Sequence, residues 1–316
     1  MQRSTKVAWL FPGQGSQLVG MGKELAATSE AARRTFERAD EALGEPLSRL
    51  CFEGPMEELT LTANTQPAIV AASAAIVAAL RERHPDLAPP VFAAGHSLGE
   101  YSALCAAGAI ELEDAVRLCR LRGSAMQAAV PPGEGAMSAI MGLDAEAIIA
   151  ICEEAAAGEI VSPANYNAPG QVVIAGHKDA VARAGDLVVA RGGKAVQLKV
   201  SAPFHCALMR SAREALAPAL ERVVIHPLAF PVIANVDASP NTDPGRVAEL
   251  LLRQIDGAVL WSASVERMAA EGVTHALELG PGKVLAGLVK RIAKSIKVLS
   301  VSDPAGIDAA AAFLEA

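Results

Sequence analysis

The chain has 316 residues, enough for one large domain or two ordinary ones. Hydrophobic residues make up 52%, charged residues 20% and aromatic residues 3%, which excludes a disordered chain and favours buried parallel strands of Ala, Val, Leu and Ile flanked by helices. The net charge of −7 gives no electrostatic argument for binding nucleic acid or an anionic membrane.

The first part of the chain alternates strands and helices. The apolar run at 6–10 predicts a strand that ends in a glycine loop, and helices are expected over 25–43 and 65–83. Thr65 is a candidate N-cap for the second helix, with Pro67 in its first turn. A strand at 91–94, a sharp turn and a helix through Ala107 follow. This order is typical of a doubly wound α/β sheet.

The middle of the chain has a different order of elements after Pro131-Pro132-Gly133. Its pattern predicts β-α-β-β-α-β, with elements at 136–142, 145–156, 160–164, 171–175, 178–191 and 195–200. That order is ferredoxin-like. The fold class we expect is therefore α/β: a hydrolase-like large subdomain with a parallel sheet (1–130 and 201–316) and an inserted ferredoxin-like small subdomain (131–200).

The last part of the chain returns to the first pattern. Its predicted strands are 231–236, 275–279 and 297–301, and its predicted helices are 246–255 and one that ends at Ile292.

Cysteine usage and apolar runs indicate the compartment. The five cysteines are odd in number and form no C-x-x-C pair, so we expect no disulfide scaffold, no zinc site and a reducing environment. The apolar run after Lys6 is too short for a signal peptide, and the stretch 68–80 falls below the ~20 residues that span a bilayer. A soluble cytoplasmic protein without a membrane span is the expectation.

Gly95-His96-Ser97-Leu98-Gly99 matches the G-x-S-x-G nucleophile elbow. It follows a predicted strand and opens a predicted helix, as that motif requires. The helix N-terminus would supply amide donors to a developing oxyanion. A serine in an ordinary turn between strand and helix is the alternative.

A serine nucleophile needs a base, and His205 is the best candidate among six histidines. It lies in a loop where the chain re-enters the large subdomain, downstream of Ser97. A structural loop histidine is the alternative. The aspartates between the two residues all fall in the insert, so either a later group or a backbone carbonyl must orient the imidazole.

Short motifs are spread along the chain, at 11–17 (FPGQGSQ), 65–68 (TQPA), 95–100 (GHSLGE), Arg122-Gly123 with Met126, 165–176 (NYNAPGQVVIAG), 203–205 (PFH) and 278–282 (ELGPG). Together they resemble the motifs of the malonyl-CoA:acyl-carrier-protein transacylases of fatty acid synthesis and of the related polyketide synthase acyltransferase domains. They occur in the family's order across nearly the whole length.

The resemblance implies a role for each matching catalytic position. Ser97 would carry the acyl group as an ester, and His205 would be the general base and then the general acid. The backbone carbonyl of Gln254 would orient His205. The backbone amides of Gln14 and Leu98 would form the oxyanion hole.

The resemblance also implies a substrate class. Arg122 would bind the free carboxylate of malonyl, because a guanidinium offers two parallel donors. Without the motif, Arg122 would be an ordinary helix-surface arginine. Phe204 resembles the malonyl-type loop and would crowd an α-methyl group. Further substrate-binding candidates are Gln66, Met126 and Asn165, of which Asn165 could instead hold a turn.

The expected substrates are malonyl-CoA and a holo-acyl carrier protein, with no metal or other cofactor, and a monomer is expected. Since the family's carrier protein is acidic, as this chain is, a local basic patch is needed. Lys290, Arg291, Lys294 and Lys194 are the candidates. A solvated helix face is the alternative.

Three other functions stay open. A serine thioesterase or hydrolase shares the elbow, but the missing acid and Arg122 argue against it. A non-catalytic carrier-binding scaffold is opposed by intact Gln14, Ser97 and His205. A discrete acyltransferase that serves a polyketide synthase would use the same residues as the fatty acid enzyme.

Overall fold

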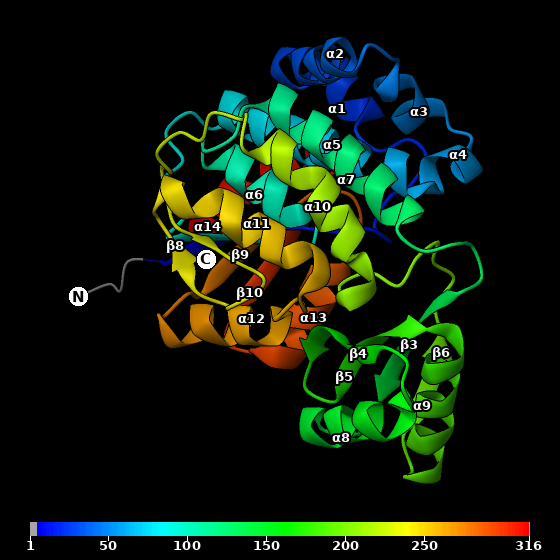
Figure 1. Cartoon of the computed structure of the whole chain (residues 1–316). Helices are drawn as coiled ribbons and strands as arrows, with labels where there is room; N and C mark the ends of the chain where they lie inside the picture. The colour runs from blue at the N-terminus through cyan, green and yellow to red at the C-terminus, as the bar shows by residue number, and fades with distance from the viewer. Residues whose placement is uncertain (1–4, 316) are drawn as a thin grey trace.

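The computed structural model describes residues 5–315, which form two β-sheets with helices packed on them (Figure 1). The larger sheet has the strand order β10-β9-β1-β2-β7-β8, and every neighbouring pair is parallel except β7 with β8. Its strands are β1 (Val7–Phe11), β2 (Phe92–Gly95), β7 (Val232–Ile233), β8 (Pro240–Asn241), β9 (His275–Leu279) and β10 (Lys297–Val301). The predicted parallel sheet is confirmed.

Both faces of this sheet are covered, which explains why its strands are almost wholly apolar. Trp9 and Phe11 of β1 pack into one hydrophobic cluster with helix α5 (Thr62–Arg83). Ala8 and Leu10 pack into a second cluster with α12 (Trp261–Ala270) and α13 (Val284–Ile292). In Figure 1 the sheet lies between these two groups of helices. The alternation along β1 therefore separates two core layers rather than core from solvent.

The helices around the large sheet include several that the sequence analysis did not name. They are α1 (Lys23–Thr28), α2 (Glu30–Leu43), α3 (Leu47–Glu53), α4 (Met56–Thr60), α5, α6 (Gly99–Ala106), α7 (Leu112–Ala128), α10 (Arg210–Leu220), α11 (Val247–Asp256), α12 (Trp261–Ala270), α13 (Val284–Ile292) and α14 (Pro304–Glu315), with short 3₁₀ turns at Ala207–Met209 and Pro244–Arg246.

Two helix boundaries differ from the predictions. The helix expected over 25–43 is broken at Ser29, whose extended backbone and side-chain bond to the Ala32 amide cap α2. The helix expected from Thr65 begins at Thr62 instead. Thr65 is not its N-cap, because its hydroxyl donates to the carbonyl of Leu59. The strand expected over 231–236 is only Val232–Ile233.

The second sheet is formed by residues 135–197. Its elements are β3 (Gly135–Met141), α8 (Ala145–Ala156), β4 (Val161–Ala168), β5 (Gln171–His177), α9 (Lys178–Ala190) and β6 (Lys194–Gln197). They follow one another in the predicted order β-α-β-β-α-β. The strands lie in the order β4-β5-β3-β6 and all pair antiparallel. The two helices cover one face around a core of their own that includes Ile140, Ile148 and Ile174.

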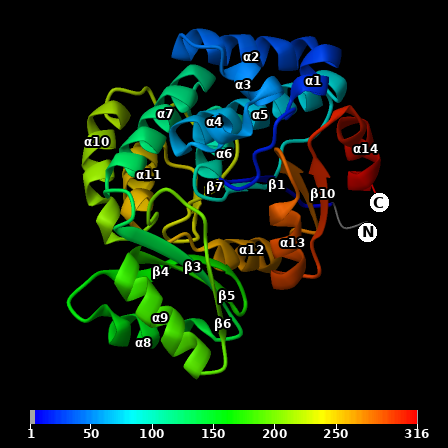
Figure 2. The ribbon, with the colours of Figure 1, turned by 90° about the vertical axis from the view of Figure 1, so that its right-hand side faces the viewer.

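The small sheet is joined to the large part of the molecule through β4. Val259, just before α12, donates to the carbonyl of Ala164 at 2.9 Å and accepts from the amide of Tyr166 at 2.9 Å. Figures 1 and 2 show β4 and β5 beside α12 and α13. This short parallel bridge fixes one edge of the small sheet against the large one.

Helix α5 is long and apolar enough to cross a membrane, which the shorter stretch 68–80 did not indicate. Yet 78% of its most apolar window is buried within the fold. Helix α5 is the central core helix on one side of the large sheet, in contact with α2 and α7.

Candidate active site

Ser97 lies on a sharp turn between β2 and α6, at the carboxyl end of a central strand. Its φ is 54°, in the left-handed region that L-residues rarely adopt. A Cβ on Gly95 would lie 1.9 Å from the carbonyl carbon of Gly99, and a Cβ on Gly99 would lie 2.2 Å from the carbonyl oxygen of Phe11. Both flanking glycines are therefore required by close backbone approach, as a nucleophile elbow demands.

His205 reaches Ser97 from the loop that follows the small sheet. Ser97 Oγ is 2.7 Å from His205 Nε2, and His205 Nδ1 is 2.8 Å from the backbone carbonyl of Gln254 in α11. His205 is buried and also has a positive φ of 61°. The predicted pairing of Ser97 with His205, and of His205 with the Gln254 carbonyl, is present in the structure.

The partners of this pair determine where its protons lie. The Gln254 carbonyl can only accept, so Nδ1 carries a hydrogen and donates to it. Arg122 can only donate, and its Nη2 donates to Ser97 Oγ at 3.0 Å. The serine hydroxyl therefore donates to Nε2, whose free lone pair faces the nucleophile. No carboxylate bonds to His205 among the described residues, in agreement with the missing triad acid.

The electrostatics of the site keep this imidazole neutral. Burial, followed by the nearby positive charge of Arg122, lowers the pKa of His205 to about 3, although the Gln254 carbonyl opposes the change. A neutral His205 is competent to accept the serine proton.

The loop after β1 packs directly against the nucleophile turn. A Cβ on Gly13 would lie 2.5 Å from the carbonyl oxygen of His96, so the residue before Gln14 packs against the residue before Ser97. Within residues 5–315, the backbone amides of Gln14 and Leu98 donate none of the backbone hydrogen bonds that form in turns and loops. The oxyanion hole that the resemblance implies at these two positions stays a prediction.

Arg122 projects from α7 into the same site and is 1% exposed. Its guanidinium donates to Gln66 Oε1 at 2.7 Å, to Gln254 Oε1 at 2.8 Å and to Ser97 Oγ, and it lies 5.7 Å from the Tyr101 ring centroid. Its Nε has no partner, and no carboxylate forms an ion pair with it in the described part of the chain. A buried positive charge without an anion is costly, so this group suits an anionic substrate.

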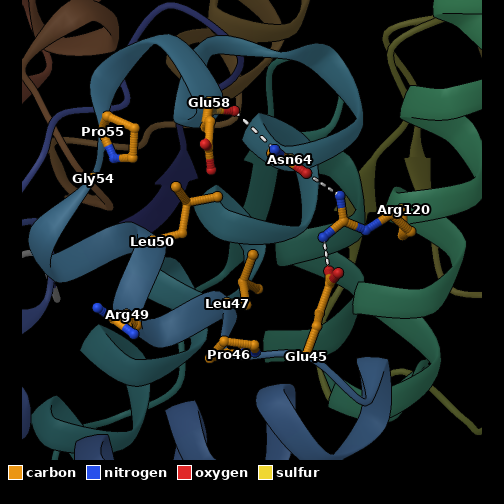
Figure 3. Close-up of a pocket in the computed structure, with 10 residues that line it drawn as sticks. All are labelled: Glu45, Pro46, Leu47, Arg49, Leu50, Gly54, Pro55, Glu58, Asn64 and Arg120. Carbon is orange, nitrogen blue, oxygen red and sulfur yellow. Dashed lines mark hydrogen bonds and ion pairs between the residues drawn. The ribbon is translucent and has the colours of Figure 1, made fainter.

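Arg120, two residues earlier on α7, points to a separate pocket of about 400 Å³ (Figure 3). It donates to Ala63 O at 2.6 Å, to the side chain of Asn64 and to the carboxylate of Glu45. Its charge is already neutralised there. The pocket contains neither Ser97 nor His205 and is not the catalytic site.

The other expected substrate-binding residues lie on different elements of the fold. Gln66 and Met126 are buried beside Arg122, where Gln66 Nε2 lies 3.8 Å from Met126 Sδ. Phe204 is buried and adjoins His205 in the chain. Asn165 lies in β4 rather than in the expected loop, and its Oδ1 is buried without a partner. Its neighbour Asn167 is the residue that contacts the nucleophile turn.

That contact joins the small sheet to the elbow. His96 Nε2 is 2.8 Å from Asn167 Oδ1, and burial lowers the pKa of His96, which favours the neutral imidazole. The other face of His96 is 5.7 Å from the Trp261 ring centroid. The residue before the nucleophile therefore leaves the turn away from the reacting hydroxyl, as expected.

Sequence reasoning assigned no role to Glu100 or to Asn235. Asn235 Oδ1 accepts from the Ser97 amide at 2.8 Å, and its Nδ2 donates to Gly95 O at 2.7 Å. Glu100 Oε2 accepts from the Asn235 amide at 3.1 Å and from Gln254 Nε2 at 2.8 Å. Burial raises the pKa of Glu100 to about 7, against the lowering effect of the Gln254 bond. An acidic residue directly after G-x-S-x-G was the available signal.

The four basic candidates all lie on the surface. Lys290 and Arg291 are in the last turn of α13, Lys294 is exposed beyond it, and Lys194 begins β6. Arg291 donates to the Gln171 side chain and to Pro169 O at 3.4 Å, in the turn between β4 and β5. Gln171, Met141 and Lys194 are register partners across the small sheet, which brings Lys194 to the same end of the sheet as Arg291.

Comparison with known proteins identifies the family of this chain. An acyl transferase domain model matches residues 8–308. The malonyl CoA-acyl carrier protein transacylase of Salmonella typhimurium is 49% identical over 97% of this chain and 99% of its own, and that of Bacillus subtilis is 48% identical over 97% and 96%.

Solved structures agree with this assignment. An acyl carrier protein S-malonyltransferase from Vibrio cholerae superposes with a TM-score of 0.94 at 50% identity, covering 97% of this chain and 100% of that one. A malonyl-transacylase in complex with a type II PKS acyl-carrier protein has a TM-score of 0.93 at 47% identity, covering 97% and 99%. The chain therefore belongs to the acyl transferase family, in the branch of the malonyl CoA-acyl carrier protein transacylases.

Proposed function

We propose that this protein transfers malonyl from malonyl-CoA to the phosphopantetheine thiol of an acyl carrier protein, through an ester on Ser97, in fatty acid biosynthesis. The observation that carries the proposal is the buried guanidinium of Arg122, which has no carboxylate partner within residues 5–315 and donates to Ser97 Oγ at 3.0 Å. The names of its relatives support the same substrates and partner.

The first half-reaction loads the enzyme. Ser97 Oγ attacks the thioester carbonyl of malonyl-CoA while His205 Nε2 accepts the hydroxyl proton. The tetrahedral oxyanion is bound by the backbone amides of Gln14 and Leu98. Collapse of this intermediate breaks the C–S bond, and His205 returns the proton to the CoA sulfur.

The second half-reaction unloads the enzyme. The carrier's phosphopantetheine thiol gives its proton to His205 and attacks the Ser97 ester. The new thioester forms, the C–O bond to Ser97 breaks, and the protonated His205 returns the proton to Oγ. The Gln254 carbonyl supports the imidazolium formed in each step through Nδ1–H. This ping-pong sequence requires neither a metal nor a redox cofactor.

Arg122 selects the acyl group in this account. When malonyl enters, the guanidinium exchanges its bond to Ser97 Oγ for the terminal carboxylate, and its unpartnered Nε becomes available for the second carboxylate oxygen. Gln66 accepts from the guanidinium and in turn contacts Met126, and Asn165 would bind the substrate. Phe204 crowds an α-methyl group, a weaker selection of ~1–3 kcal/mol.

The carrier protein would dock on the basic surface of Lys290, Arg291, Lys294 and Lys194. The bonds of Arg291 to the β4–β5 turn support a single surface that extends from α13 to the end of the small sheet. Reversing the charge at Lys290 and Arg291 should raise the carrier KM and spare acyl-enzyme formation. Lys23→Glu on α1 is the matched control, and a carrier KM unchanged by the double reversal contradicts the proposal.

The division of the chain is part of the proposal. Residues 1–130 and 201–316 form a hydrolase-like subdomain, residues 131–200 form the ferredoxin-like subdomain, and the substrate enters between them. The antiparallel order β4-β5-β3-β6 supports the second assignment. We expect a monomer that acts in the cytoplasm.

A second candidate differs only in the carrier. The similarity to a malonyl-transacylase bound to a type II PKS acyl-carrier protein favours a polyketide carrier as an alternative partner. The same active-site residues serve both reactions, so the carrier alone separates them.

Intact mass spectrometry after mixing the protein with malonyl-CoA tests the proposal. A malonyl adduct on Ser97 that moves to a holo-acyl carrier protein is the expected result. Free malonate and CoA without a loaded carrier would instead establish a hydrolase. No adduct would contradict the assignment of malonyl as the acyl group, and a panel of other acyl-CoA thioesters would then identify the donor.

A further inference from the structure

One carboxylate oxygen connects two segments that hold the nucleophile. Glu100 is buried at 3% exposure in α6, three residues after Ser97. Its Oε2 accepts from the Gln254 side-chain amide of α11 at 2.8 Å and from the Asn235 backbone amide at 3.1 Å. Both donors come from parts of the chain more than 130 residues away. No basic side chain forms an ion pair with Glu100 in residues 5–315.

The carboxylate, together with the Ser97 carbonyl, fixes which way the Gln254 amide faces. Gln254 Nε2 donates to two acceptors, Glu100 Oε2 and the Ser97 carbonyl at 2.9 Å. Its Oε1 is thereby directed toward Arg122, from which it accepts at 2.8 Å. If the amide were reversed, its oxygen would face two acceptors, Glu100 Oε2 and the Ser97 carbonyl, and its nitrogen would face the Arg122 donor. Glu100 therefore acts on Arg122 through Gln254.

We infer that Glu100 is a positioning residue for carboxylate selection: it orients Gln254 so that Arg122 is held beside Ser97 Oγ. The inference rests on the proposed function, since it concerns how the same site distinguishes malonyl from an uncharged acyl group. Glu100 does not touch the reacting atoms. Its removal should therefore affect malonyl transfer more than acetyl transfer.

Three variants separate positioning from general support of the fold. Glu100→Met keeps the approximate volume but removes the acceptor, whereas Glu100→Gln retains an oxygen that can accept both bonds. Glu278→Met is the matched control. Glu278 is also a buried carboxylate, and it accepts from the Leu285 and Ala286 amides and from Ser300 Oγ, away from the dyad.

The experiment measures kcat/KM for acylation by malonyl-CoA and by acetyl-CoA in each variant. Labelling of Ser97 by a fluorophosphonate, which carries no carboxylate, reports on the dyad alone. For Glu100→Met we expect the malonyl-to-acetyl ratio to fall about tenfold or more, with fluorophosphonate labelling within about threefold of wild type. Glu100→Gln should restore most of the ratio, and Glu278→Met should leave the ratio unchanged.

Equal losses with both acyl donors in Glu100→Met would overturn the inference, as would a Glu100→Gln variant as impaired as Glu100→Met. A similar change of ratio in Glu278→Met would show that any buried carboxylate has this effect, and would also overturn it. These outcomes leave malonylation of the wild type intact. Failure of the wild type to accept malonyl would instead refute the proposed function, and with it the selectivity assigned to Glu100.

Discussion

Arg120 and Arg122 lie on the same helix, and their surroundings differ in the feature that matters for catalysis. Positions two residues apart in an α-helix are separated by about 200° around its axis, so the side chains of Arg120 and Arg122 point in nearly opposite directions. Arg120 is paired with Glu45 at the surface pocket of Figure 3. Arg122 is buried among neutral partners and the nucleophile. A paired arginine is structural, whereas a buried arginine without an anion is suited to receive one from a substrate.

The largest effect is expected when the Ser97 hydroxyl, which Arg122 contacts and Arg120 does not, is removed. Ser97→Ala deletes the oxygen shared by His205 and Arg122, so acylation should fall by about 10⁴-fold or more, to a level without a detectable adduct. Intact mass spectrometry after incubation with malonyl-CoA checks this. A malonyl adduct on the variant would place the nucleophile elsewhere.

Replacing each arginine by alanine in turn tests whether Arg122, and not Arg120, serves the substrate. Arg122→Ala removes the guanidinium that donates to Ser97 Oγ, and kcat/KM for malonyl-CoA should fall by about 10²-fold, with a smaller loss for acetyl-CoA. Arg120→Ala should leave both values near wild type, because its partners are Glu45, Asn64 and Ala63. Equal losses for the two acyl donors in Arg122→Ala would refute the carboxylate role.

The pH dependence of stability sharpens the difference between Glu45, which is paired with an arginine, and Glu100, which is not. Burial raises the pKa of Glu100 from 4.5 to about 7, so the folded state holds a proton that the unfolded chain has released. The associated stability is present below about pH 4.5 and is lost as the pH rises through 7.

The corresponding measurement compares the wild type with Glu100→Gln, which cannot ionise. Between pH 4.5 and pH 7 the wild type should lose on the order of 2 kcal/mol of unfolding free energy relative to the variant. His205, whose pKa is lowered to about 3, contributes an opposite trend that is common to both proteins and cancels in the difference. A difference in unfolding free energy between the two proteins that stays constant with pH would contradict the raised pKa of Glu100.

The smallest effect is expected when the planar guanidinium of Arg122 is replaced by an ammonium group. Arg122→Lys retains the positive charge but lacks the planar fork and cannot bond to Gln66, Gln254 and a carboxylate in the same way. Malonyl kcat/KM should fall about tenfold, less than in Arg122→Ala. Steady-state kinetics with both variants checks the order. A lysine variant as active as wild type would show that charge alone suffices.

The sequence predicted the regular parts of the fold because they are local. The strands at Phe92–Gly95, His275–Leu279 and Lys297–Val301 lie where apolar runs predicted them, and the β-α-β-β-α-β order was readable from periodicity. The break at Ser29 was missed because a capping serine inside an amphipathic pattern does not interrupt its period.

The site was predictable only where residues form a contiguous motif or match a known family. Ser97 stands in such a motif, His205 was the best candidate base by its position downstream of Ser97, and Gln254 followed from the resemblance. The hydrogen bonds of Asn235 and Glu100 join segments more than 130 residues apart, and no spacing in the sequence encodes those bonds. Asn165 was assigned to a loop because the two bulges in β4 disturb its alternation.

A crystal structure of the malonyl-loaded enzyme would test the central claim most directly. We expect the ester on Ser97 Oγ and both terminal carboxylate oxygens within about 3 Å of the Arg122 guanidinium, whose bond to Oγ has been released. A malonyl carboxylate directed away from Arg122, with the guanidinium still bound to Ser97 as in the free enzyme, would contradict the account.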